Sequence, residues 1–568
     1  MSWEKSTIYI KAYKEDSDCY SISIESLSII YVFAVCESEH LELKLKLISS
    51  PLDVCIKLDT INVKYSVIDV ENILPKLSTY CTWPIITVNN NVIAGVSSVA
   101  RKIIQQSNNT KVEYLLGFRG NCLMACSEVS VWTMFCEIDM PQSLKQLLRD
   151  IATNANSIII PNCLSRFEYH LSQPVKIHNI YKVARNENNK KFSMDIPKDA
   201  LNLAHKYAEG PAMTISDIIL FPYFHIFFKI LDIYNLQKKF PLTHNWYKNL
   251  LYEFRHQLDL ILPSVSNQLD IIVDGSFTKQ SLYKSDMSQY KMEKKSFTKQ
   301  TNIERALQII SSSNISVMNS NSLYGSDIGF CWNNVPLELN PRGGSLPEMR
   351  ADRKCEQLES MAKSCIKIVG NSVSTIVDFC SGSGHLGLLL AYLLPKCHVI
   401  LVENKEKSLL RATERIEILD LKNVTVVQSN LDYFSADFQL GVSLHACGTA
   451  TDLVMQMCVK KNANFVCCPC CYGGIQTCHL LDFPRSRSFL SLKQLTYKDY
   501  LSLAHGADQT HDDENAKTKQ GYLCMDIIDT DRKLYAEAFD YIIFLGKLQP
   551  VTCTNKNNML VGIKTIQE

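Results

Sequence analysis

The chain has 568 residues, of which 46% are hydrophobic and 21% charged, and its formal net charge is +1. This length predicts two or three domains, because single hydrophobic cores stop growing well below it. The balanced charge excludes a global attraction to nucleic acid or anionic lipid, so any basic binding face has to be local. We find neither a signal peptide nor an apolar stretch long enough for a bilayer. With 22 cysteines scattered through apolar runs, we expect a reducing, cytoplasmic location and no membrane contact.

The first 108 residues show the pattern of a βαβ unit followed by a β-hairpin and a helix. Alternating hydrophobicity predicts strands at 8–13 and 41–47, with an apolar helix at 26–36 between them. Residues 83–98 predict two strands joined by an Asn-rich turn and then a helix start. This order resembles a thioredoxin-like module. The proline before the hairpin of such a module is usually cis, and we expect this of Pro84.

Residues 109–262 predict helices, and one helix start is clearly marked. Thr214 and Asp217 have the spacing of a capping box, directly before a strongly apolar run. This feature and the segment 240–246 resemble the C-terminal helical domain of glutathione S-transferases (GSTs). The resemblance implies a GST-like half, with a degenerate thioredoxin-like part at 1–108 and an all-α part at 109–262.

The GST resemblance raises the question whether this chain has the residues that bind glutathione in that family. The family activates glutathione through Tyr, Ser or Cys in the first strand-to-helix loop, which here offers Ser17, Cys19 and Tyr20. It also uses an acid–Ser pair after the hairpin, but Val96 precedes Ser97 here and cannot hold an ammonium group. We therefore expect a non-catalytic scaffold that binds a protein partner or forms a homodimer. A glutathione-binding transferase is the weaker alternative.

Residues 263–345 predict a partly disordered linker. The stretch is rich in Ser, Asn and Lys, and the pentapeptide at 276–280 recurs at 296–300. One short repeat is too little for a repeat architecture. A solvated linker is favoured over a basic segment that grips RNA.

Strands and helices alternate through residues 346–550, which predicts a doubly wound parallel sheet with its ligand at the carboxyl ends of the strands. A late strand or edge is expected at 538–546, and residues 551–568 are expected to form a C-terminal tail. The expected strands are 376–379, 398–403, 424–427, 439–444 and 465–468, and the expected helices are 354–369, 386–394, 407–419 and 450–460.

The turn after the first of these strands indicates the cofactor. Its register, Asp378-x-Cys380-x-Gly382-x-Gly384, lacks the Gly-x-Gly-x-x-Gly pattern that a nicotinamide pyrophosphate requires. An acidic residue here suits a cationic ligand and would repel a phosphate. Glu403 ends the next strand, where a carboxylate can accept both hydroxyls of a ribose.

These strand ends resemble class I S-adenosylmethionine-dependent methyltransferases, with Cys380 where most members carry Gly. The resemblance implies S-adenosylmethionine as cofactor, with Asn430 or Asp432 after the third strand facing its adenine. The candidate cofactor-binding residues are Asp378, Cys380, Ser381, Gly382, Gly384, Glu403, Asn404 and Asn430.

Two loops at the same sheet edge carry the tentative catalytic candidates, which are His445, Cys447, Cys470 and Cys471. His445 titrates near neutrality and is a candidate general base. It can equally hydrogen-bond the cofactor carboxylate or a backbone carbonyl, and both interpretations stay open. Asp452 can orient His445, although a solvated acid at a helix start is the more common case.

The cysteine-rich loop also raises the question of a metal site. Cys467 with Cys470, and Cys468 with Cys471, have Cys-x-x-Cys spacing, but no second pair follows at zinc-finger separation. Packing of a substrate loop is therefore favoured over a zinc or iron–sulfur site, and no metal is expected.

The His-x-Cys-Gly and Pro-Cys-Cys loops resemble a methyltransferase subgroup that includes tRNA 2′-O-methyltransferases. The full order of parts resembles the family of glutathione S-transferase C-terminal domain-containing proteins. The resemblance implies a multidomain α/β protein whose second half is a Rossmann-like class I methyltransferase domain, with RNA as the favoured substrate. The alternative from another class is a scaffold that keeps the cofactor pocket without catalysis.

Overall fold

The computed structural model describes residues 6–15, 19–36, 40–58, 63–89, 91–107, 109–117, 131–153, 158–159, 161–176, 203–231, 233–259, 271–272, 282, 299–317, 320–344, 346–510 and 515–565. The chain divides into two compact units, Met1–Asp286 with Asp432–Ser435 (unit 1), and Met287–Leu431 with Ala436–Glu568 (unit 2). In the described part of the chain, no helix is both long and apolar enough to cross a membrane.

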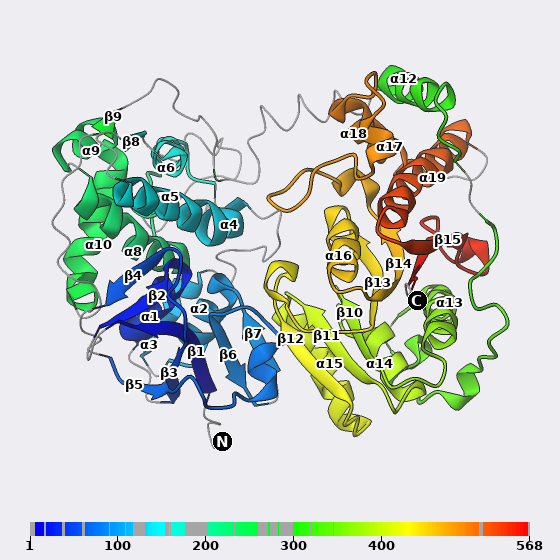
Figure 1. The fold of residues 1–568 in the computed structure, drawn as a ribbon, viewed down its shortest axis with the longest axis horizontal. Helices are drawn as coiled ribbons and strands as arrows, with labels where there is room; N and C mark the ends of the chain where they lie inside the picture. Colours follow the sequence, from blue (N-terminus) through cyan, green and yellow to red (C-terminus); the bar gives the residue numbers. More distant parts are fainter. Residues whose placement is uncertain are drawn as a thin grey trace, which may run out of the picture. The chain divides into compact units, whose positions relative to one another are not determined.

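Unit 1 contains a mixed sheet built around β1 (Figure 1). The apolar helix α1 carries the chain from β2 to β3, which lies parallel to β1, and β1 also pairs antiparallel with β2 and β6. The expected strands, the helix between them and the hairpin of β6 and β7 are confirmed, as is the cis bond between Trp83 and Pro84. The elements are β1 (Ser6–Lys14), β2 (Tyr20–Ser23), α1 (Ile24–Cys36), β3 (Leu41–Leu47), β4 (Cys55–Leu58), β5 (Tyr65–Ile68), β6 (Ile85–Val88), β7 (Asn91–Ala94) and α2 (Val96–Gln105).

Apart from the short strands β8 and β9, which interrupt the expected all-α part, the remaining described elements of unit 1 are helical, and the predicted capping box begins α8. The Asp217 carboxylate accepts the backbone N–H of Thr214 at 2.8 Å and the indole N–H of Trp246 at 2.7 Å. One buried acid therefore caps α8 and fastens it to α10. The elements are α3 (Thr110–Glu113), α4 (Val131–Met134), a π-helical turn (Phe135–Asp139), α5 (Met140–Ala152), β8 (Ile158–Ile159), α6 (Asn162–Leu171), α8 (Ile215–Ile230), α9 (Ile233–Lys239), α10 (Pro241–Asp259) and β9 (Ile271–Ile272).

Unit 2 contains a sheet in the order β12-β11-β10-β13-β14-β16-β15. Its first five members are parallel, and β16 is antiparallel to both of its neighbours. The strand order reverses between β10 and β13, so ligands are expected in the crevice beyond their carboxyl ends. The strands are β10 (Thr375–Phe379), β11 (His398–Glu403), β12 (Val424–Gln428), β13 (Leu440–Cys447), β14 (Asn464–Cys470), β15 (Tyr541–Lys547) and β16 (Asn558–Lys564).

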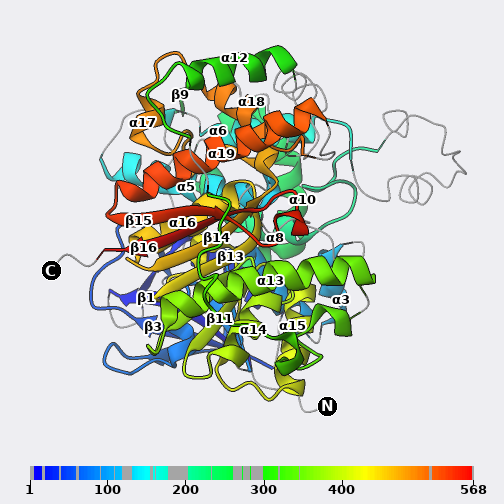
Figure 2. The same ribbon diagram turned by 90° about the vertical axis from the view of Figure 1, so that its right-hand side faces the viewer.

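Helices flank this sheet as the sequence predicts. The chain runs from β10 through β11 to β12 in one direction along the sheet, and then from β13 to β14 in the other direction. Because the crossovers are right-handed, α14 and α15 lie on one face of the sheet and α16 lies on the other. Helix α13 packs against α14, and α19 packs against β15 and β16 (Figure 2). The helices are α12 (Gln300–Ser311), α13 (Glu348–Val369), α14 (His385–Leu393), α15 (Glu406–Ile418), α16 (Thr449–Lys460), α17 (Arg487–Leu490), α18 (Tyr497–Gly506) and α19 (Ala516–Glu537).

Two expected segments differ from the structure. The expected tail at 551–568 contains β16, which pairs with both β14 and β15 and so satisfies the backbone groups on the edge of β14. The expected linker at 263–345 contains α12 and ends in a packed stretch, where Leu323, Val335 and Leu339 are buried in the core of unit 2. The other linker residues lie mostly outside the described ranges.

Candidate functional site

The turn between β10 and α14 is built from residues in the left-handed region. Cys380, Gly382 and Gly384 have φ values of 54°, 56° and 75°. A Cβ on Gly384 would lie 2.9 Å from a methyl group of Leu401, so glycine alone lets α14 pack there. The φ of Cys380 gives the physical reason for the Gly usual at this position, because an L-residue adopts this conformation at a cost.

Asp378 lies under this turn and is 2% exposed. Its Oδ2 accepts the backbone N–H of Gly387 at 2.8 Å, which anchors the first turn of α14. Burial raises the pKa of Asp378 to about 7, and Lys354 acts in the opposite direction. The structure thus gives Asp378 a role in holding the turn, while its contact with a cofactor stays a prediction.

Glu403 joins two loops at the carboxyl edge of the sheet. Its Oε2 accepts the N–H of Gly382 at 2.9 Å, and its Oε1 accepts those of Asn404 and Lys405, each at 3.0 Å. The side-chain amide of Asn404 donates to Oδ1 of Asn430 at 3.3 Å. The structure therefore brings together Glu403, Asn404 and Asn430, which the sequence placed after two different strands.

This edge fits a ligand that carries hydroxyl and amino groups. The Oγ atoms of Ser381 and Ser429 are buried and have no hydrogen-bond partner within the described part of the chain. No atom lies within 4 Å of a Cβ built on Gly382, so open space adjoins the N–H that Glu403 accepts. Unsatisfied buried hydroxyls are costly unless a ligand or water completes them. The residues present therefore suit the ribose and amino-acid groups of S-adenosylmethionine.

His445 lies near the end of β13, where the register with β14 shifts, in a left-handed conformation with φ 68°. Its Nε2 lies 2.9 Å from Oε1 of Gln357, and the amide nitrogen of Gln357 donates to the carbonyl of Cys553 at 3.0 Å. The Cys553 carbonyl fixes the orientation of Gln357, so His445 carries its proton on Nε2 and keeps Nδ1 as an acceptor. Burial, and then Lys354, lower the pKa of His445 to about 4, so the ring is neutral at pH 7.

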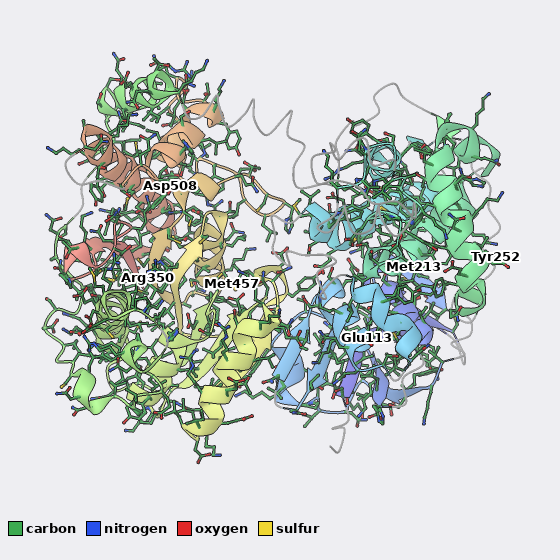
Figure 3. All side chains as sticks on the ribbon, turned by 180° about the vertical axis from the view of Figure 1, so that it is seen from behind. Glu113, Met213, Tyr252, Arg350, Met457 and Asp508 are labelled. Carbon is green, nitrogen blue, oxygen red and sulfur yellow. The ribbon has the colours of Figure 1, made fainter. Side chains whose placement is uncertain are left out.

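Gln357, the hydrogen-bond partner of His445, also lines a cavity of about 470 Å³. Its lining includes the cations Arg350, Arg353, Lys354 and Lys556, and no acidic residue of the described ranges lines it. Figure 3 labels Arg350 on α13. Residues 350, 354 and 357 are spaced i, i+4 and i+7, so they lie along one face of α13. This face was not predicted from the sequence, although that spacing, with cations at its first two positions, was the available signal.

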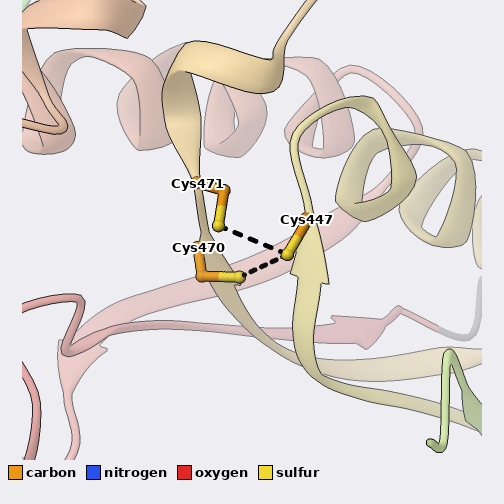
Figure 4. A group of neighbouring side chains, drawn as sticks. All are labelled: Cys447, Cys470 and Cys471. Atoms are coloured by element: carbon orange, nitrogen blue, oxygen red, sulfur yellow. Dashed lines mark hydrogen bonds between the residues drawn. The ribbon is translucent and has the colours of Figure 1, made fainter. Parts of the chain in front are cut away.

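The cysteines group differently from their spacing in the sequence. Cys467 and Cys468 are fully buried in β14, whereas Cys470 and Cys471 at its end meet Cys447 from the end of β13. The Sγ of Cys447 lies 3.2 Å from that of Cys470 and 3.3 Å from that of Cys471 (Figure 4). The thiol of Cys470 lowers the pKa of Cys447 to about 6, and the same contact raises the pKa of Cys470.

Asp452 contacts a different partner from the one considered in the sequence analysis. It is 2% exposed and forms a two-pronged ion pair with Arg532 of α19, with N···O distances of 3.0 and 2.7 Å. Arg532 also contacts Asp529 at 3.0 Å. Asp452 therefore neither orients His445 nor lies on a solvated helix start, because its carboxylate is committed to a buried pair.

Comparison with known proteins identifies the family. A family model described as a methyltransferase domain matches residues 353–478. The glutathione S-transferase C-terminal domain-containing protein homolog of Drosophila melanogaster is 39% identical over 501 residues, which cover 83% of each chain. Ribosomal RNA small subunit methyltransferase G of a Thermotoga species is 41% identical over 63 residues, 11% of this chain and 28% of that protein.

Among solved structures, a SAM dependent methyltransferase from Aquifex aeolicus is similar to 38% of this chain and 96% of its own, with 14% identity and a TM-score of 0.22. The match to the methyltransferase family model agrees with the strand order and strand-end residues of unit 2, and the cofactor of this domain is S-adenosylmethionine. The chain belongs to the family of glutathione S-transferase C-terminal domain-containing proteins, and its second half carries a methyltransferase domain.

Proposed function

We propose that the chain transfers a methyl group from S-adenosylmethionine to RNA. The observation that carries the substrate class is the basic cavity lined by Gln357, the residue that hydrogen-bonds His445. Four cations line it, on a chain whose net charge is only +1. Such a local concentration of Arg and Lys is the means by which a nearly neutral protein holds a phosphate backbone. The similarity of a short segment to a protein named for ribosomal RNA methylation agrees with this class.

The residues at the sheet edge have separable roles in this reaction. Glu403 and Asn430 would hold the ribose and adenine, and the bound cofactor supplies an electrophilic methyl group. Nδ1 of His445 can accept the proton of an attacking hydroxyl or amine, because Gln357 keeps the other ring nitrogen protonated. The low pKa of His445 keeps it in the neutral form that a base requires, although it also makes it a weak base.

Labelling tests the substrate class. Purified protein and S-adenosylmethionine with a radioactive methyl group are incubated with RNA, and separately with protein, from cells lacking this chain. We expect label in RNA for the wild type and much less for the double variant Arg350→Ala, Arg353→Ala. The two arginines lie outside the cofactor residues, so calorimetry should show unchanged cofactor binding.

Binding of the acceptor RNA gives a second measure. Each lost phosphate contact lowers the salt slope of binding by about 0.7–0.9, so the double variant should lose about 1.4–1.8. Label in protein but not in RNA would contradict the proposed substrate. A labelled RNA with an unchanged salt slope would contradict the role of the cavity.

We propose that unit 1 is a GST-like module that recruits a protein partner or a second copy without using glutathione. Ser97 is the serine of the expected acid–Ser pair, but its backbone N–H already donates to the carboxylate of Glu137 at 2.6 Å. Glu137 is 7% exposed and belongs to the π-helical turn. Among the first-loop candidates, Tyr20 begins β2 and Cys19 directly precedes it, whereas Ser17 lies outside the described residues. Turnover of glutathione with a chromogenic electrophile would contradict this proposal.

The free thiols suggest where this activity takes place. Two cysteines that are exposed at the surface, Cys331 and Cys447, carry free thiols. Thiols persist in reducing compartments, so we propose that the protein works in the cytoplasm.

A further inference from the structure

Three thiols converge at the end of two neighbouring strands. Cys447 and Cys470 are register partners of the parallel pair β13 and β14, and Cys471 follows directly. The three Sγ atoms all lie within 4.8 Å of one another. Figure 4 shows the three side chains pointing toward a common point between the strands.

The backbone around the thiols holds this arrangement without help from the sulfurs. Cys471 has a φ of 50° and Gly448 a φ of 59°, and the N–H of Gly448 donates to the carbonyl of Cys470 at 3.2 Å. A Cβ on Gly448 would lie 2.5 Å from the carbonyl oxygen of Gly474, so the two loops are packed backbone to backbone.

A carboxylate completes the scaffold. Asp508, which is labelled in Figure 3, accepts the N–H groups of Tyr472 and Gly473 at 3.0 and 2.8 Å. The loop after Cys471 is therefore fixed from outside the cluster. Ligands that are positioned before a metal arrives lose little conformational freedom on binding it.

The spacing of the sulfurs suits a tetrahedral soft metal. Zinc–sulfur bonds of about 2.3 Å place neighbouring ligands about 3.8 Å apart on a tetrahedron. Widening the distances of 3.2 and 3.3 Å to that value needs displacements of only about half an ångström. Thiolates select zinc over the hard cations magnesium and calcium.

We propose that Cys447, Cys470 and Cys471 bind one Zn²⁺ through three thiolates. Cys447 and Cys471 are exposed whereas Cys470 is buried, so the fourth coordination position faces outward and takes water or a group of a bound ligand. Three protein ligands with an open position are typical of zinc sites that take part in chemistry. Cysteine spacing within one loop could not predict this site, because Cys447 comes from the neighbouring strand β13.

Metal loading of the full chain tests the proposal. Protein purified under reducing conditions is stripped of metal, reloaded with Zn²⁺ or Co²⁺ and analysed for bound metal. We expect one zinc per chain, and for cobalt the visible bands of a tetrahedral site with thiolate-to-metal charge transfer. Cys447→Ser and Cys471→Ser should each weaken zinc binding at least tenfold. Cys331→Ser, an exposed cysteine elsewhere in unit 2, should bind as the wild type does.

The wild type provides a readout that needs no variant. Zinc should protect Cys447 and Cys471 from alkylation by a maleimide and leave Cys331 reactive. The proposal is overturned if the reduced wild type binds no zinc, if the cluster variants bind as tightly as the Cys331→Ser control, or if zinc gives no protection. A disulfide from Cys447 to Cys470 or Cys471 in protein handled without oxygen would also overturn it.

Discussion

The carboxylate of Glu403 gives a quantitative test of the cofactor site. Its oxygens accept three backbone N–H groups, from Gly382, Asn404 and Lys405. A carboxylate has about four lone-pair positions, so it can still accept from a ribose hydroxyl. The variant Glu403→Gln keeps the shape of the side chain but replaces one acceptor oxygen with a donor. Since Oε1 serves two N–H groups, the amide oxygen should stay there and leave the Gly382 side without an acceptor.

The expected loss follows from the charge that is removed. A hydrogen bond to a charged group contributes about 1.5–3 kcal/mol, and each 1.4 kcal/mol is tenfold in affinity. Losing one such bond to the ribose should weaken S-adenosylmethionine binding about 10- to 140-fold. Isothermal titration calorimetry measures this loss directly.

The matched control is Glu414→Gln, which makes the same charge change at an exposed position of α15. Thermal unfolding of each variant shows whether it remains folded. If folded Glu403→Gln binds the cofactor within twofold of the wild type, or if Glu414→Gln loses as much affinity, the placement of the ribose on Glu403 is wrong.

Three further predictions concern stability. Asp452→Ala leaves the buried Arg532 without its two-pronged partner and should lower the free energy of unfolding, measured in urea, by about 3–5 kcal/mol. Asp437→Ala removes a surface ion pair in which the Asp side chain is 90% exposed, and should lower it by less than about 1 kcal/mol. Equal losses would contradict the role of the buried pair. Cys380→Gly removes the backbone strain of a non-glycine residue in the left-handed region, so it should leave stability unchanged or raise it by up to about 1 kcal/mol. A clear loss of stability, measured in the same way, would refute this strain. Burial lowers the pKa of His170 to about 3, below its unfolded value of about 6.5. The free energy of unfolding of unit 1 should therefore fall by up to about 1.4 kcal/mol per pH unit as the pH falls from 6.5 toward 3. Unfolding measured across this range should show a flatter pH slope for His170→Gln, and an equal slope would contradict the prediction.

The parts of the fold that the sequence predicted correctly are those with local signals. The turn at 380–384 follows a β-branched strand and precedes an apolar helix, so its structure is determined by neighbouring residues. The positions of Glu403 at the end of β11 and of Asn430 just after β12 follow from the same alternation. The capping box of Thr214 and Asp217 is likewise contained within four residues.

The features that the sequence analysis missed join residues that are far apart in the chain. Arg532 lies 80 residues from Asp452, and Gln357 lies 88 residues from His445. No periodicity can reveal such pairs, because they depend on which strands become neighbours. Cys447 joined Cys470 for the same reason, since adjacent parallel strands bring their ends together.

The position of β16 has a consequence for synthesis of the protein. This strand follows β15 in the chain, yet it lies between β14 and β15 and pairs with both. While the ribosome is still making residues 558–564, the nascent domain has an open edge on β14 and cannot seat β15. The sheet can therefore close only after almost the whole domain has emerged, so the unfinished chain is the state in which chaperones would find an unpaired strand edge.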